Sequence, residues 1–317
     1  MDGLATGLAF AQSLAFAQTI LAGKGFEEMP VLLLATTASP AVAGQGVLQT
    51  SLEAIVLGIV QGITEFLPIS STAHLIIFTD ILGWKDAWDK AAIDALQFGS
   101  VIAVVWYFWK DIQQILSGAW AALRAKDWQR EEWKLLVGIA IGTIPALAGG
   151  LLLKLLKVSL DQAIIIAVMS IVMAMLLGLA EKVGRRKRGF DQLQVSDGIL
   201  VGLGQMIALL PGASRSGSTL TTALFLGLQR DTAARFSFLL GIPTLAIATL
   251  VQAKDVLDKG DMLIPLLVAI FSAFVFSYLS IAWLMGFLRR QSTWVFVWYR
   301  LALGTALLIA VANGLLT

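Results

Sequence analysis

The sequence contains no cysteine and a single histidine, His74, among its 317 residues. The lack of cysteine excludes disulfides, thiolate catalysis and cysteine-based metal sites. One histidine per chain also excludes a histidine-rich metal centre and a proton relay between two histidines. Charged residues are scarce, at 14% of the chain, and the formal net charge is only +2. The available chemistry therefore rests on carboxylates, hydroxyl groups, arginines and one imidazole, and no nucleic-acid partner is expected.

Hydrophobic residues, in contrast, make up 58% of the chain, and the mean hydropathy of +0.82 is well above that of a soluble domain. The apolar runs are about 20 residues long and lack strand-like alternation, so they predict membrane-spanning helices rather than a barrel. We therefore expect an all-α polytopic membrane protein. The expected spans lie near 91–110, 134–156, 162–181, 232–252, 262–288 and 295–316.

Two further segments, 47–83 and 195–228, are apolar but interrupted by polar, helix-breaking stretches. The first stretch is EFLPISSTAH (65–74), and the second is PGASRSGST (211–219). Irregular backbone occurs at membrane depth only where protein buries it or water reaches it. Each segment is long enough for two short helices around a break, which favours a re-entrant helical hairpin; a pair of short ordinary spans is the alternative.

The two interrupted segments resemble each other, and each is followed by three expected spans. Residues 58–61 (GIVQ) precede Pro68, and residues 202–205 (GLGQ) precede Pro211. Because three crossings are an odd number, the second repeat must be inverted relative to the first. Inverted repeats with broken helices place the functional site between them, near the midplane. The expected repeats cover about 47–181 and 195–316.

Lysine and arginine concentrate in two expected loops, 110–134 and the segment that follows residue 181. The order of the spans puts both loops on one side of the membrane, which the positive-inside rule makes cytoplasmic. The first hairpin then opens to the outside, the second opens to the cytoplasm, and the C-terminus lies outside.

Residues 1–45 stand apart from the single membrane domain expected at 46–317. They contain two modest apolar stretches, and Ala41-Val42-Ala43 resembles a signal-peptidase site. A signal-like extension, an extra uncleaved helix and a start codon placed too early are all compatible with this pattern. No function is assigned to this region.

Two polar residues precede the first break on one helical face, because Gln61 and Glu65 are four residues apart. Glu65 is placed where it could bind a metal ion or take a catalytic proton, with Gln61 as a second metal ligand. The alternative is a structural carboxylate that neighbouring hydroxyl groups satisfy.

A run of hydroxyl side chains, Ser70, Ser71 and Thr72, precedes His74. The hydroxyl groups of Ser70 and Thr72 are also typical of a helix N-cap, which would need no catalytic role. Ser71 and His74 are three residues apart, so at the start of a helix they can face the same cavity. Because His74 is the only histidine and lies beside a break, we expect a catalytic rather than a purely structural imidazole.

Arg215 is the strongest signal of the second break. A permanently charged guanidinium at membrane depth is costly unless it is paired, and its planar donors match phosphate oxygens. Gly212 lets backbone approach closely, and a helix N-terminus would add free N–H groups. A structural ion pair with Glu65 is the alternative and does not exclude a function. The side chains that complete the expected anion site are Ser214, Ser216 and Thr219.

The cost of isolated buried charge predicts that the two breaks meet. A carboxylate, an imidazole and a guanidinium become tolerable in a low dielectric if they share one hydrated cavity. We therefore expect the side-chain tips of Glu65, His74 and Arg215 to line one cavity, within roughly 10 Å of one another.

The two motifs, QGITEFLPISSTAH (61–74) and PGASRSGST (211–219), closely resemble those of the BacA/UppP family of undecaprenyl pyrophosphate phosphatases. The similarity extends from about residue 50 to residue 316, and residues 1–45 have no counterpart in the usual family pattern. Gln61 stands where some members have glutamate, which removes one carboxylate from a metal site.

The resemblance implies a bacterial inner-membrane hydrolase that converts undecaprenyl pyrophosphate to undecaprenyl phosphate and inorganic phosphate. This reaction recycles the lipid carrier of peptidoglycan synthesis and confers bacitracin resistance. The resemblance further implies a divalent cation (Mg²⁺ or Ca²⁺), an active site open to the periplasm, and a homodimer.

The resemblance and the residue chemistry together indicate roles for individual side chains. The expected catalytic residues are Glu65, Ser71, His74 and Arg215. The expected substrate-binding residues are Ser70, Thr72, Gly212, Ser214, Ser216 and Thr219. Ser71 is favoured as the nucleophile with His74 assisting, and attack by water or by His74 itself are the alternatives.

A transporter or flippase for the lipid carrier is the rival from another functional class. Inverted repeats with re-entrant hairpins are typical of transporters, and such a protein would use the same head-group site. It would not need Ser71 or His74 as reactive groups. Phosphate release in detergent separates the two classes, since detergent abolishes vectorial transport but not hydrolysis.

Overall fold

The computed structural model describes residues 40–156, 163–257 and 262–316, and within these ranges the regular elements are helices. The chain divides into two compact units, one that ends at Leu48 and one that spans Gln49–Thr317. The prediction for residues 1–45 falls largely outside the described residues and stays a prediction.

Five helices of the described chain are long and apolar enough to cross a membrane. They confirm five of the six expected spans and establish an all-α, multi-pass membrane protein. These helices are α8 (Glu131–Leu155), α9 (Ala163–Val183), α12 (Arg230–Leu257), α13 (Leu263–Leu288) and α14 (Trp294–Ala312).

The sixth expected span, at 91–110, is not one straight helix. The chain forms α5 (Lys90–Ala95) and α6 (Gln97–Tyr107), and it bends by 64° before α7 (Trp109–Ala125). The prediction of a loop at 110–134 was wrong, because α7 occupies most of it. This helix is amphipathic, so an average over hydropathy does not detect it. The residues that it buries recur at helical spacing: Ile115, Gly118, Ala119 and Ala122.

Both interrupted segments form two helices around a break, as the sequence predicts. The first consists of α3 (Pro40–Phe66) and α4 (Ser71–Ile81). The second consists of α10 (Val195–Met206), the 3₁₀ turn η3 (Ile207–Leu209) and α11 (Arg215–Phe225). The helix α3 is longer than expected, at 27 residues. A second short 3₁₀ turn, η2 (Phe190–Gln192), precedes α10.

The two breaks have the same unusual backbone. The N-cap residues Ser70 and Ser214 adopt φ/ψ values of 73°/100° and 69°/117°, outside the regions that side chains prefer. Each serine hydroxyl accepts a hydrogen bond from the amide three residues ahead, at Ala73 (3.4 Å) and Gly217 (3.2 Å). These caps satisfy amides at the start of each second helix. Strain of this kind persists where the surrounding structure enforces it, which is typical of functional sites.

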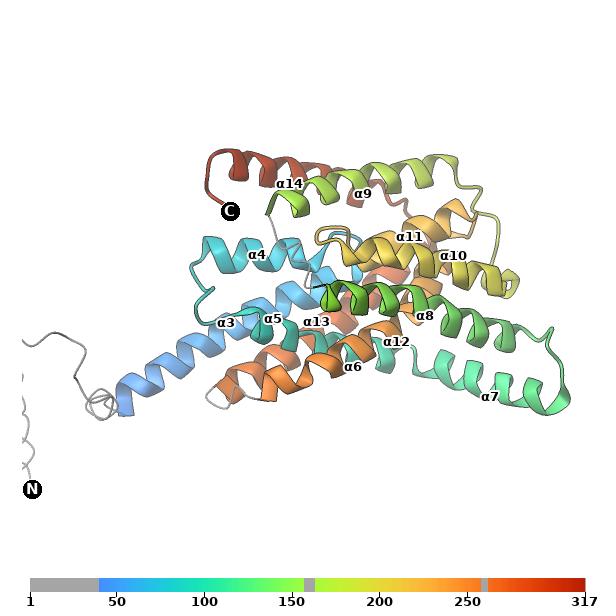
Figure 1. The fold of residues 1–317 in the computed structure, drawn as a ribbon, viewed down its shortest axis with the longest axis horizontal. Coiled ribbons are helices and arrows are strands. Elements are labelled where there is room, and N and C mark those ends of the chain that lie inside the picture. Colours follow the sequence, from blue (N-terminus) through green and yellow to red (C-terminus); the bar gives the residue numbers. More distant parts are fainter. Residues whose placement is uncertain (1–39, 157–162, 258–261, 317) are drawn as a thin grey trace, which may run out of the picture. The chain divides into compact units, whose positions relative to one another are not determined.

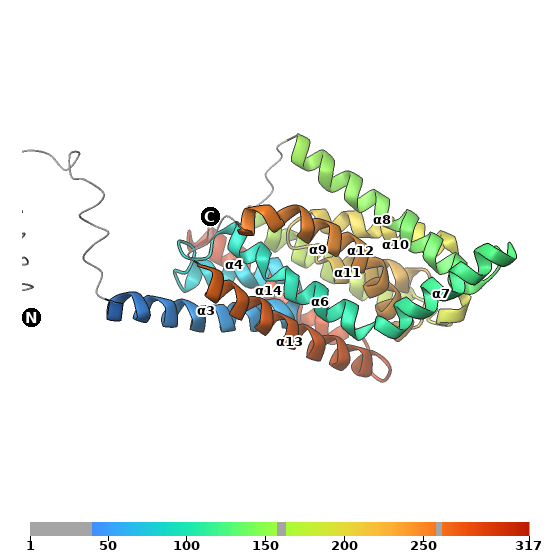
Figure 2. The same ribbon diagram turned by 90° about the horizontal axis from the view of Figure 1, so that it is seen from below.

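Small residues bring the helices of the two halves into backbone contact. In α10, a Cβ atom at Gly198 or Gly202 would lie only 2.3 or 2.1 Å from the carbonyl oxygens of Gly138 and Gly142 in α8. A similar glycine, Gly58 in α3, lies against α13. Figures 1 and 2 show α8 beside α10 and α3 beside α13. Such close crossings are typical of helices that associate in membranes.

The remaining contacts enclose the breaks. The helices α9 and α14 lie side by side (Figure 1), α11 packs on α9, and α4 packs on α14 through an apolar cluster that includes Ala73 and Leu307. Each helix that follows a break is thus held by the last long helix of the opposite half. This arrangement brings both breaks to the middle of the helix assembly.

Gly202→Ala should lower the melting temperature in detergent, because the added Cβ would meet backbone of Gly142 at 2.1 Å. Overpacking of this kind costs about 1–3 kcal/mol. The matched control is Gly286→Ala, where a Cβ would have nothing within 4 Å. Equal melting temperatures for the two variants would show that the contact between α8 and α10 does not stabilise the fold.

Candidate active site

Glu65, in the last turn of α3, connects the two breaks. Its Oε1 accepts a hydrogen bond from Nη2 of Arg215 at 3.3 Å, across 150 residues of sequence. Its Oε2 accepts hydrogen bonds from the Ser71 hydroxyl at 2.8 Å and from Nε2 of Gln61 at 3.2 Å. The ion pair that was the structural alternative for Arg215 is therefore formed, and it brings the chemistry of both halves together.

Arg215 uses only part of its donor capacity in that pair. Its Nε and Nη1 atoms are buried and have no hydrogen-bond partner among the described residues. The guanidinium lies 5.8 Å from the ring centroid of Phe66, and Gly241 of α12 makes room for it, since a Cβ there would lie 2.0 Å from Nη1. Unpaired buried donors are costly, and these two nitrogens could bind the oxygens of an anion.

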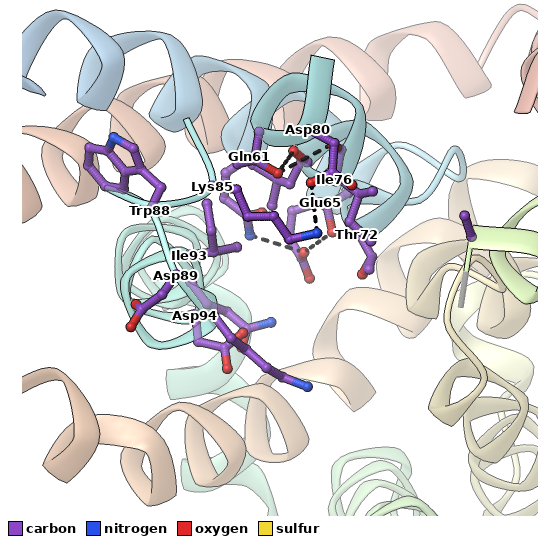
Figure 3. Close-up of a pocket in the computed structure, with 16 residues that line it drawn as sticks. Gln61, Glu65, Thr72, Ile76, Asp80, Lys85, Trp88, Asp89, Ile93 and Asp94 are labelled. Carbon is purple, nitrogen blue, oxygen red and sulfur yellow. Dashed lines mark hydrogen bonds and ion pairs between the residues drawn. The ribbon is translucent and has the colours of Figure 1, made fainter. Parts of the chain in front are cut away.

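Two cavities meet at this cluster. The first, of about 430 Å³, lies among α3, α4 and α5, and we call it the acidic cavity because Asp80, Asp89 and Asp94 line it with Glu65 (Figure 3). The second, of about 210 Å³, lies between the breaks and is called the arginine cavity after Arg215. The residues that line both are Glu65, Ser71, Thr72 and Gln97.

The expected substrate-binding residues divide into two groups. Those that line the arginine cavity are Ser70, Thr72, Gly212 and Ser214. Ser216 and Thr219 do not line it. The Ser216 hydroxyl donates to the carbonyl oxygens of Glu65 (3.2 Å) and Leu67 (3.0 Å), and that of Thr219 donates to the carbonyl of Arg215 (2.9 Å). These two hydroxyl groups hold backbone in place, because a buried hydroxyl needs a partner.

His74 lines neither of these two cavities, contrary to expectation. Its Nδ1 lies 2.7 Å from the carbonyl oxygen of Ser70, and its Nε2 lies 2.6 Å from the hydroxyl of Tyr299. Since a carbonyl only accepts, Nδ1 donates, and in the neutral ring Nε2 accepts from Tyr299.

The expected pairing of His74 with Ser71 is absent for a geometric reason. The residues of α4 that line the acidic cavity follow a helical repeat: Ser71, Thr72, Leu75, Ile76, Thr79 and Asp80. His74 falls on the other side of this repeat and faces α14. Glu65, not His74, is therefore the proton acceptor within hydrogen-bonding distance of Ser71.

Arg300 of α14 is a residue that the sequence analysis missed. It is 0% exposed and donates to the carbonyl oxygens of Pro68 (3.1 Å) in the first break and of Gly212 (2.8 Å) and Ala213 (3.1 Å) in the second. A further bond reaches the carbonyl of Ser170 in α9 at 3.3 Å. The available signal was an arginine within an expected span, which is costly and usually functional.

The side chains present fit a cation that is carried largely by substrate. Among the described residues no cluster of three or more histidine, aspartate or glutamate side chains could hold a metal ion. Mg²⁺ is usually bound by one or two carboxylates together with substrate phosphates, and Glu65 supplies one carboxylate beside the Ser71 hydroxyl. Gln61 would have to rotate its amide, since it now donates Nε2 to Glu65.

Comparison with known proteins matches residues 54–306 to a family model described as bacitracin resistance protein BacA. The chain belongs to this family. A curated undecaprenyl-diphosphatase of Thermosynechococcus vestitus is 69% identical over 263 residues, which cover 83% of this chain and 96% of the relative. A curated undecaprenyl-diphosphatase of Trichormus variabilis is 53% identical over 289 residues, which cover 88% of this chain and 90% of the relative.

A third relative, an undecaprenyl-diphosphatase of Synechocystis, bears on the N-terminal region. It is 47% identical over 314 residues and covers 96% of each chain, so its similarity extends into residues 1–45. The family model begins only at residue 54. The N-terminal region therefore lies outside the family pattern but has a counterpart in this relative.

Proposed function

We infer that the protein hydrolyses undecaprenyl pyrophosphate to undecaprenyl phosphate and inorganic phosphate. The observation that carries this inference is that two buried donors of Arg215 have no partner among the described residues and lie next to a serine that is hydrogen-bonded to a carboxylate. Family membership and the names of the relatives agree with it. The protein thereby recycles the lipid carrier of peptidoglycan synthesis, which accounts for bacitracin resistance.

Binding of the pyrophosphate rests on the second break. Arg215 offers Nε and Nη1 to phosphate oxygens and keeps Nη2 on Glu65. The N-terminus of α11, an 11-residue helix, adds backbone N–H groups and a favourable dipole. Developing charge on the phosphate is stabilised by donors that are already in place.

The chemical step uses Ser71 as the nucleophile. Its Oγ attacks the terminal phosphorus while its proton passes to Oε2 of Glu65, and the bond from that phosphorus to the bridging oxygen breaks. Undecaprenyl phosphate leaves with the proton that Glu65 took from Ser71, and water then attacks the phosphoserine. Glu65 takes the proton of the water and returns it to Oγ of Ser71 as the bond from phosphorus to that oxygen breaks. His74 acts indirectly, since it holds the Ser70 carbonyl at the break.

A divalent cation, Mg²⁺ or Ca²⁺, would be held by Glu65, with Gln61 as a further ligand, and would neutralise charge on the phosphates. Chelation with EDTA should therefore abolish hydrolysis, and added Mg²⁺ should restore it. Phosphate release is the measurement, with the melting temperature as a control for folding. Full activity after chelation would exclude the cation from the reaction.

The test of the function is phosphate release by the purified protein in detergent. Wild-type protein should release inorganic phosphate from undecaprenyl pyrophosphate, and Ser71→Ala should not. The matched control, Ser117→Ala, changes an exposed serine whose hydroxyl bonds only its own helix. No release by wild-type protein, together with uptake of the lipid head group in vesicles, would favour the transporter.

The inverted repeat with re-entrant hairpins belongs to the same proposal. It is supported by the matching backbone at Ser70 and Ser214 and by reciprocal packing, in which α3 contacts α13 and α10 contacts α8. An inner-membrane location, a site open to the periplasm and association of two copies are further proposals. They rest on the family resemblance and on the lysine- and arginine-rich segments at 110–134 and after residue 181.

The absence of cysteine makes the orientation directly testable. A cysteine introduced at Asn313, near the end of α14, should react with a membrane-impermeant thiol reagent in intact cells, whereas one at Lys187 should not. Both should react after the cells are permeabilised. The reverse pattern in intact cells would overturn the orientation.

A further inference from the structure

Gln205, in the last turn of α10, lines the arginine cavity, and its amide is only partly hydrogen-bonded. The residue is 2% exposed, and its Nε2 donates to Oγ1 of Thr244 at 3.0 Å. Its Oε1 is buried and has no hydrogen-bond partner among the described residues. Gln205, Thr244 and Arg215 all line this cavity.

Either orientation of the Gln205 amide leaves one of its two polar atoms without a partner among the described residues. With the two amide atoms exchanged, Thr244 would donate to Oε1, and Nε2 would be the free atom. In either orientation Thr244 satisfies one end of the amide and the other end stays free. Leaving a buried polar atom unpaired is costly, so the free end, like the two free nitrogens of Arg215, is suited to a ligand.

The chemistry of the free atoms identifies the ligand. Arg215 offers two donors from a rigid fork, which suits the oxygens of a phosphate. Phosphate near neutral pH is partly protonated, so it can also donate a hydrogen bond to an amide oxygen. An amide that can present either atom therefore suits both protonation states of a phosphate.

The geometry favours the terminal phosphate over the phosphate that carries the lipid. The arginine cavity is about half the volume of the acidic cavity, at about 210 against 430 Å³. A volume of this size holds one phosphate group, whereas the phosphate that carries the lipid also needs apolar space for its prenyl chain. A free phosphate needs none.

The repeat in the sequence also associates Gln205 with the anion. Gln61 and Gln205 occupy equivalent positions in GIVQ (58–61) and GLGQ (202–205). Gln61 donates to Glu65, on the side of the nucleophile, whereas Gln205 is next to Arg215, on the side of the anion. The proposed reaction uses only the first of this pair.

We propose that the arginine cavity is the subsite for the phosphate that is released last, and that Gln205, oriented by Thr244, binds this phosphate. The proposal rests on the proposed function, because it assigns a product of that reaction to a place in the site. If phosphate leaves last, added inorganic phosphate must compete with undecaprenyl pyrophosphate for the free enzyme.

The experiment measures inhibition by inorganic phosphate in detergent, with formation of undecaprenyl phosphate followed by chromatography. Gln205→Leu should raise the inhibition constant for phosphate by about tenfold, the usual effect of one hydrogen bond to a charged group. Thr244→Val should raise it by about threefold, because the amide is no longer oriented. Gln291→Leu, at an exposed position, is the matched control and should change nothing.

Gln205→Glu keeps the shape of the side chain and covers the case in which the leucine variant does not fold. Its carboxylate should weaken inhibition by phosphate further as the pH rises and both groups become charged. A purely structural role would lower the melting temperature and the rate but leave the inhibition constant unchanged. An unchanged constant in both Gln205 variants, or no inhibition of the wild type by phosphate, overturns the proposal. Absence of undecaprenyl phosphate from the wild-type reaction would instead overturn the proposed function.

Discussion

Arg215→Lys should reduce hydrolysis below about a tenth of the wild-type rate, a loss above 1.4 kcal/mol in transition-state stabilisation, although the positive charge is kept. The guanidinium serves two partners at once: Nη2 binds Glu65, while Nε and Nη1 are free for phosphate. A lysine has one nitrogen on a flexible chain. It can pair with Glu65 or with the substrate, but it cannot reproduce the planar grip on two oxygens.

The measurement is kcat/KM for phosphate release in detergent, with melting temperature as the folding control. Arg124→Lys is the matched substitution, because Arg124 is exposed and its guanidinium lies over the ring of Trp120 at the far end of α7. It should leave the rate unchanged. If Arg215→Lys retains more than about a tenth of the activity, the positive charge alone is sufficient and the bidentate contact is not required.

Arg300→Leu should abolish hydrolysis and also lower the stability of the protein. Three carbonyl oxygens at the two breaks would lose their donor, and each unsatisfied buried acceptor costs about 1–3 kcal/mol. The loss should be at least about 2 kcal/mol, since part of it is recovered by relaxation. Arg300→Lys should fall between the leucine variant and the wild type, because one ammonium cannot reach both breaks in the same geometry.

The test of Arg300 combines melting temperature, phosphate release and a distance measurement. Spin labels on cysteines introduced at Leu82 and Phe225, after α4 and at the end of α11, should show a broader distance distribution in Arg300→Lys than in the wild type. Arg290→Leu, which removes an exposed arginine, is the control and should change none of the three. Wild-type melting and activity in Arg300→Leu would show that Arg300 does not hold the breaks.

Hydropathy averaged over about 20 residues predicted the long membrane spans correctly. Five expected spans match helices, because a long apolar run in a membrane has to satisfy its backbone within itself. It failed at α7, where a one-sided apolar face of a charged helix is buried by packing on α8. The two breaks were also predictable, since proline and a run of hydroxyl groups oppose a continuous helix.

His74 and Arg300 show what local pattern could not decide. The spacing of Ser71 and His74 permits a shared face, but which side of α4 meets the cavity depends on how α4 packs against α14. The role of Arg300 depends on carbonyl groups that lie in two segments far away in sequence. Neither the contact of His74 with α14 nor the bridging of the two breaks by Arg300 can be predicted from neighbouring residues in the sequence.

The sequence by itself therefore determined the helical membrane class, the two polar breaks, the family resemblance and the residues able to carry phosphate chemistry. These follow from composition and from the fixed cost of charge and broken backbone in an apolar medium. Only the tertiary structure decided which of those residues meet. It paired Glu65 with Ser71 and Arg215, turned His74 towards Tyr299, and placed Arg300 between the breaks. The physical reason is that helix rotation and crossing are set by side-chain packing across the whole assembly, such as the glycine contacts of α8 and α10, rather than by neighbours in sequence.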